Sequence, residues 1–125
     1  MKIISTICSK DKDESLGLLP AVQRYISSRI ANVFDTAKKE GSPFYILSGE
    51  YGLIPADYPI PYYDHQLKME EVNDISRKIV GQIKGNGITE IVFYGRSKDG
   101  SWKPYYEALE KAAEETNTFV TTIDL

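Results

Sequence analysis

The chain has only one cysteine and only one histidine, and each of these low counts excludes a type of site. A single cysteine cannot form an internal disulfide, which fits a reducing compartment. With only one histidine beside it, a structural zinc site has too few ligands. No apolar run approaches the roughly eighteen residues of a membrane helix, and the N-terminal apolar stretch is too short for a signal peptide. We therefore expect a cytoplasmic protein without a bound metal.

The net charge and the length of the chain limit its type of surface and its number of domains. A net charge of −3 argues against a broad basic surface for non-specific nucleic-acid binding, but it leaves room for a local basic pocket. At 125 residues, with 42% hydrophobic and 26% charged residues, the chain is expected to form one domain over 1–125. Neither G-x-G-x-x-G nor a Walker lysine loop is present, so no dinucleotide or nucleotide cofactor is expected.

Hydrophobic periodicity predicts alternating strands and helices. The expected strands are 2–8, 44–47, 90–94 and 118–124, and the expected helices are 20–39, 69–84 and 104–115. This alternation predicts an α/β three-layer sandwich with a four-stranded, mostly parallel sheet in the order 2-1-3-4 and helices on both faces. Ser48 to Leu67 shows no clear helix or strand period, and a connection this long is more often a functional loop than a passive one.

Three segments are expected to leave the sheet at its carboxyl edge, where open α/β sheets bind ligands. They begin at Cys8, Ser48 and Gly95, and they carry hydroxyls, cations and aromatic rings. The loops expected at the opposite edge, 40–43, 86–89 and 115–117, are plain by comparison and carry no cation and no aromatic ring. The candidate ligand-binding residues are Ser9, Lys10, Lys12, Tyr51, Gly52, Tyr63, Arg96 and Ser97. The cations are candidates for a phosphate or carboxylate, and the tyrosines, with Trp102 and Tyr105, for stacking on a base or sugar.

Four residues are candidates for catalysis: Cys8, Ser48, Asp64 and His65. Cys8 is either a nucleophile beside Lys10 and Lys12 or a small apolar residue at the end of a buried strand. Asp64 and His65 are neighbours in an extended segment, so their side chains should point to opposite sides and not form a direct dyad. His65 is either an acid–base group facing Ser48, Tyr51 or Cys8, or an anchor for the long loop.

These motifs resemble those of a small bacterial and phage family of unknown function. Its pattern here reads Cys8-Ser9-Lys10-Asp11-Lys12, Tyr25-Ile26-Ser27, Leu47-Ser48-Gly49-Glu50-Tyr51-Gly52-Leu53 and Ile60-Pro61-Tyr62-Tyr63-Asp64. One tyrosine is inserted before Asp64, and the 95–105 segment is longer than the family's. The pattern is also distantly similar to the YaaA peroxide-stress proteins and to a domain of archaeosine synthase, whose Cys-x-x-x-Lys motif has the spacing of Cys8 and Lys12. This resemblance implies nucleobase or nucleic-acid-linked chemistry.

Three functions remain open at this point. The chain is an enzyme that modifies a nucleobase or nucleotide, a non-catalytic module that binds a nucleotide or nucleic-acid element, or a structural domain whose long loop covers the sheet edge. The sequence indicates no membrane partner and no oligomeric state.

Overall fold

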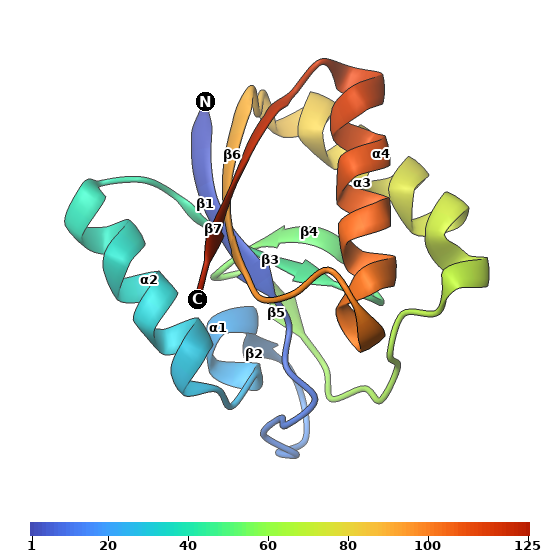
Figure 1. Cartoon of the computed structure of the whole chain (residues 1–125). Helices are drawn as coiled ribbons and strands as arrows, with labels where there is room; N and C mark the ends of the chain where they lie inside the picture. The colour runs from blue at the N-terminus through green and yellow to red at the C-terminus, as the bar shows by residue number, and fades with distance from the viewer.

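The computed structural model describes all residues 1–125 and shows a central sheet with helices on both faces, together with a small two-stranded sheet (Figure 1). The strands are β1 (Lys2–Ile7), β2 (Leu19–Pro20), β3 (Phe44–Ser48), β4 (Gly52–Pro55), β5 (Pro59–Ile60), β6 (Glu90–Gly95) and β7 (Phe119–Asp124). The helices are α1 (Ala21–Arg24), α2 (Ser28–Glu40), α3 (Val72–Asn86) and α4 (Lys103–Thr116), with short 3-10 turns η1 (Met69–Glu71) and η2 (Gly100–Trp102). The α/β class is confirmed.

Strand β1 lies at the centre of the five-stranded sheet, and five of its six residues are therefore buried. Successive side chains of β1 point to opposite faces of the sheet and pack in two separate hydrophobic cores. Ile3 and Ile7 pack in the cluster under α3 and α4, whereas Ile4 packs in the cluster under α2. Since β1 pairs in parallel with both β3 and β6, the carboxyl ends of all three strands meet at one edge.

The sheet has five strands in the order β4-β3-β1-β6-β7, so the prediction of four strands is wrong. The four expected strands keep their relative order, and β4 adds an antiparallel edge to β3. A three-residue turn, Gly49 to Tyr51, joins β3 to β4, and Gly52 follows it with φ +79°. Glycine adopts this left-handed conformation without a steric penalty, which lets the chain reverse here. The expected structureless stretch therefore contains two strands, β4 and β5.

The expected helix over 20–39 is two helices. Tyr25 ends α1 with an extended backbone (ψ 123°), and Ser27 caps α2 by accepting a hydrogen bond from the amide of Ile30. Serine at this position satisfies an amide that has no partner within the helix. The apolar spacing runs through the break, which is why periodicity alone did not reveal it, and Ile26 consequently lies exposed.

A helix that crosses a bilayer needs about 20 mostly apolar residues. No helix of this chain meets that length and composition.

Arg24 is the largest fully buried side chain, and it organises the segment after β1. Its guanidinium donates to the carbonyls of Asp13 (2.6 Å), Ser15 (3.0 Å) and Gly17 (2.7 Å), and also to that of Ile60. One side chain therefore fixes three carbonyls of the 9–18 segment against β5. The rigid fork of arginine donors suits this task, because several bonds form at the entropic cost of one side chain.

We expect Arg24→Leu to lower the free energy of unfolding by roughly 3 kcal/mol, because four carbonyls lose a charged donor. Urea denaturation measures this change. Limited proteolysis should show new cleavage between residues 9 and 18. The exposed neighbour supplies the control, since Gln23→Leu should change stability by no more than about 0.5 kcal/mol. Equal stability of the two variants would contradict this role of Arg24.

Candidate functional site

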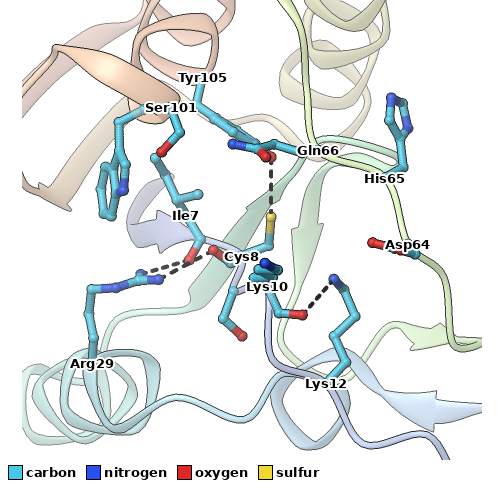
Figure 2. A pocket seen from close by; sticks show the side chains of 12 residues that line it. Ile7, Cys8, Lys10, Lys12, Arg29, Asp64, His65, Gln66, Ser101 and Tyr105 are labelled. Carbon is cyan, nitrogen blue, oxygen red and sulfur yellow. Dashed lines mark hydrogen bonds between the residues drawn. The ribbon is translucent and has the colours of Figure 1, made fainter.

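A pocket of about 430 Å³ opens at the carboxyl end of β1. Four segments of the chain form it: the end of β1 with the following loop, the first turn of α2, the segment before η1, and η2 with the start of α4 (Figure 2). The lining residues are Ile7, Cys8, Ser9, Lys10, Lys12, Arg29, Asp64, His65, Gln66, Ser101, Trp102 and Tyr105. The predicted convergence of chemically active side chains at this edge is thus observed for the segments after β1 and β6.

Three cations line the pocket, and none of them forms an ion pair. Lys10, Lys12 and Arg29 face it, while the ion pairs of the chain involve other basic residues. Lys12 Nζ instead donates to the carbonyl of Lys10 at 3.2 Å and lies 4.7 Å from the centre of the Tyr63 ring. Asp64 is the one carboxylate that lines the pocket. The pocket is therefore a locally positive site on an acidic protein, suited to an anion.

Arg29 was not anticipated from the sequence. Its Nη1 donates to the carbonyl of Ile7 at 2.7 Å and to Thr6 Oγ1 at 2.8 Å, and its Nη2 to the carbonyl of Cys8 at 3.3 Å. The guanidinium carbon also lies 5.0 Å from the centre of the Trp102 ring. Burial lowers the pKa of Arg29, and its charge still has no acidic partner. One signal could have revealed it: a cation in the first turn of a helix opposes the helix dipole.

Cys8 lies at the centre of the pocket (Figure 2). Its amide donates to the carbonyl of Leu47 at 2.9 Å, which holds it beside β3, and its Sγ lies 3.9 Å from Tyr105 Oη. Tyr105 Oη also accepts from the amide of Leu67 at 3.2 Å. Burial raises the pKa of Tyr105, and a negative charge on Cys8 raises it further. The phenol therefore keeps its proton and can donate it as a hydrogen bond to a thiolate.

Ser48, Tyr51 and Tyr63 lie behind the pocket and do not line it. Ser48 is fully buried, and its Oγ accepts from the amides of Glu50 and Tyr51 at 3.1 and 3.0 Å. Ser48 Oγ also forms a hydrogen bond with Tyr63 Oη at 3.0 Å. The same Tyr63 hydroxyl forms a second hydrogen bond with Tyr25 Oη at 2.5 Å. Tyr51 packs edge-on against Tyr63. The hydroxyls of Ser48, Tyr63 and Tyr25 satisfy one another, and Ser48 holds the β3–β4 turn, so none of these three is left free to bind a ligand.

His65 and Asp64 line the pocket, but their side chains leave the backbone in different directions (Figure 2). His65 Nδ1 meets Glu50, and its Nε2 lies 2.8 Å from Glu71 Oε2. Both ring nitrogens face carboxylates, so the imidazole is charged when both contacts are made. His65 is thus a clamp between the β3–β4 turn and η1, which leaves no ring nitrogen free for acid–base work. Asp64 makes no hydrogen bond or ion pair within the chain and faces the pocket.

The other predicted site residues lie outside the pocket. Gly52 begins β4, where a side chain would collide with Gln82. Arg96 is exposed, and its carbonyl accepts from Tyr106 Oη at 2.6 Å, although its charge is near enough to Arg29 to lower that residue's pKa slightly. Ser97 is exposed and donates to Asp99 at 3.1 Å. The 95–105 segment reaches the pocket further along, through Ser101 and Trp102.

Because His65 bridges two carboxylates, we expect the stability of the protein to depend on pH. This dependence on histidine titration can be assigned to His65, because the chain has no other histidine. The hydrogen bond to Glu71, followed by that to Glu50, raises the pKa of His65 above its ordinary 6.5. The stabilisation is therefore fully present below about pH 6.5, and it is lost as the pH rises through the folded-state pKa. At the acid end it is lost again as Glu71, whose pKa the contact with His65 lowers, becomes protonated.

Melting temperatures of the wild type and of His65→Gln, measured from about pH 5.5 to about pH 9, check this expectation. The wild type should melt higher near pH 6, and the difference should shrink toward alkaline pH. A difference that is constant across this range would show that the imidazole charge contributes nothing.

Comparison with known proteins gives one match. The family model described as a family of unknown function (DUF6884) matches residues 3–121, which is nearly the whole chain. No curated protein and no solved structure matches the chain. The matched range includes every residue that lines the pocket. The chain therefore belongs to the DUF6884 family.

Proposed function

We propose that this protein binds a nucleobase-containing anion, either a nucleotide or a nucleic-acid element, in the pocket at the carboxyl end of β1. The observation that carries the proposal is the set of cations without ion pairs, Lys10, Lys12 and Arg29, around one hollow. An anion that entered it would gain charge-assisted hydrogen bonds without having to displace an existing carboxylate.

Two further features favour a base over a simple inorganic anion. Trp102 and Tyr105 bring aromatic side chains to the same pocket, where a planar ring can stack. Asp64 and Gln66 add a carboxylate acceptor and an amide, which both donates and accepts, to the lining of the same pocket. Bases carry donors and acceptors on their edges and therefore need such a mixed lining. The similarity of the Cys8 and Lys12 spacing to archaeosine synthase, noted from the sequence, points to the same class of ligand.

A thermal-shift screen against nucleobases, nucleosides and nucleotides tests the binding proposal. A ligand that binds only the native state raises the melting temperature, by an amount equivalent to about 2.7 kcal/mol at one hundred times its dissociation constant. We expect nucleotides to give larger shifts than the matching nucleosides, because only nucleotides supply the anion. The absence of a shift with every compound would count against the proposal and would leave a structural role.

Variants of the two lysines that line the pocket locate the binding site. Lys10→Ala or Lys12→Ala should weaken nucleotide binding roughly tenfold, which corresponds to about 1.4 kcal/mol. Lys84→Ala is the matched control, because Lys84 is an exposed lysine on α3 that lies outside the pocket. Isothermal titration calorimetry measures the dissociation constant of the nucleotide for each of the three variants. Equal affinities in the three variants would place the ligand elsewhere.

Catalysis is the second candidate function, and the position of Cys8 favours it. The thiol faces the pocket among basic side chains, the usual setting of a cysteine nucleophile, with the Tyr105 hydroxyl 3.9 Å away. An enzyme would convert a ligand found in the screen, whereas a binding module would return it unchanged. Cys8→Ala should then abolish turnover but keep most of the thermal shift. The single cysteine also fits the reducing cytoplasm that we propose as its location.

Alkylation tests whether Cys8 is an accessible nucleophile in a positive pocket. The thiolate sulfur displaces iodide from iodoacetate or iodoacetamide, so that a sulfur–carbon bond replaces the carbon–iodine bond. The cations should favour the anionic reagent, so the ratio of the two rates should be higher for Cys8 than for a small free thiol in the same buffer. Lys10→Ala with Lys12→Ala, or added salt, should lower this ratio. A ratio that is the same for Cys8 and for the free thiol would argue against electrostatic activation.

A further inference from the structure

The two edges of the sheet are protected very differently. At the β4 edge, the outward amide of Leu53 donates to Gln82 Oε1 at 2.7 Å, and Gln82 Nε2 donates to the carbonyl of Tyr51 at 2.8 Å. A side chain of α3 thus occupies the backbone groups of that edge. No such cover lies over β7, which borders the sheet on its other side (Figure 1).

Strand β7 also lacks the residues that usually keep an edge from pairing. Its sequence, Phe-Val-Thr-Thr-Ile-Asp, contains no proline and no charge before Asp124. Natural proteins blunt an exposed edge with charges, prolines or bulges. Phe119 is 70% exposed and Ile123 is 38% exposed. A six-residue strand whose first five residues are β-branched or aromatic therefore presents an open edge to solvent.

The backbone hydrogen bonds show which groups of β7 face outward. The amide of Phe119 donates to the carbonyl of Thr89 at 3.0 Å, and that of Leu125 to the carbonyl of Gly95 at 2.9 Å. The odd-numbered residues thus direct their amides and carbonyls toward β6. Because these groups alternate along a strand, Val120 and Thr122 direct theirs away from the sheet.

The side chains alternate in the same way. Val120 packs against the core under α3 and α4. Phe119, Thr121 and Ile123 therefore lie on the opposite face, the one that carries α2. Helix α2 packs on β1 and β3 and leaves this part of the face uncovered.

We propose that two copies of this chain associate through β7, with the two edge strands antiparallel about a two-fold axis at Thr121. In this register Val120 of one copy faces Thr122 of the other. The two-fold axis produces two such Val120–Thr122 pairs. Within each pair the two residues exchange two backbone hydrogen bonds through the amides and carbonyls that point away from the sheet. The result is one continuous sheet across both chains, and the contact is isologous, as a two-fold axis requires.

Self-complementarity of the side chains selects a second copy as the occupant. About Thr121, each Phe119 faces an Ile123, and the two Thr121 residues face each other. Aromatic with β-branched residues and threonine with threonine are favourable cross-strand pairs. All three are non-hydrogen-bonded pairs, where the side chains come closest. Moving the axis to Thr122 would place Val120 opposite Asp124, and moving it to Val120 would place Ile123 opposite Asn117. Of these three registers, only the central one pairs Phe119 with Ile123 and sets no apolar residue of β7 opposite Asp124 or Asn117.

The oligomeric state of the full chain tests this proposal independently of any ligand. Light scattering coupled to size-exclusion chromatography should give a mass that rises with concentration toward twice the 14.1 kDa of one chain. Thr121→Lys should keep the protein monomeric, because it sets two lysines against each other on the axis. Gln23→Lys adds the same charge at an exposed position on α1 and should still dimerise. Circular dichroism confirms that both variants fold.

A charge-pairing experiment tests the register itself. Thr121→Glu should also be monomeric alone, but an equimolar mixture with Thr121→Lys should form a heterodimer, since lysine would then face glutamate across the axis. A wild type that remains monomeric at the highest soluble concentration would overturn the proposal. So would a Thr121→Lys variant that still dimerises, or a mixture of the two variants that does not associate.

Discussion

The parallel pairing of β1 with β3 on one side and β6 on the other is the constraint on which the rest of the molecule depends. Parallel pairing requires the carboxyl ends of all three strands to reach the same edge, so each connection must leave from there. The hydrogen bond from the Cys8 amide to the Leu47 carbonyl extends this pairing one residue beyond β1. It places the thiol at the floor of the pocket.

Two layers with different tasks surround that thiol. The inner layer consists of Ser48, Tyr25 and Tyr63, whose hydroxyls bond to one another and carry no charge. Burial raises the pKa of both tyrosines, so this layer stays neutral. The outer layer contains Lys10, Lys12 and Arg29, whose charges have no acidic partner. A neutral, hydrogen-bonded support thus lies beneath three cations that no carboxylate neutralises.

The 9–18 segment, which forms one wall of the pocket, is held in place by a residue that lies outside the pocket. The segment carries Lys10 and Lys12, yet Arg24, a residue outside the pocket, fixes its carbonyls. On the opposite wall, His65 joins Glu50 to Glu71 and so holds the backbone that presents Asp64 and Gln66. Both walls are therefore positioned by charged side chains buried or clamped behind them.

Sequence reasoning correctly predicted the α/β class, the alternation of elements and the meeting of the segments after β1 and β6 at one edge, because these follow from the hydrophobic period and from the geometry of parallel strands. It missed β4, since a run as short as Leu53-Ile54 has too few residues to show a period. It also missed the break at Ser27, because a capped interruption preserves the apolar spacing on both sides.

By itself, the sequence determined the composition, with one cysteine, one histidine and a small net negative charge. Its local pattern also determined an α/β domain with polar and charged residues at the ends of strands. Only the tertiary structure decided which of those residues share a hollow. It turned Ser48 and Tyr63 inward, bound both nitrogens of His65, and brought Arg29 from a neighbouring helix to the carbonyls of Ile7 and Cys8. The physical reason is that side-chain direction depends on long-range packing and hydrogen-bond partners, which sequence spacing does not encode.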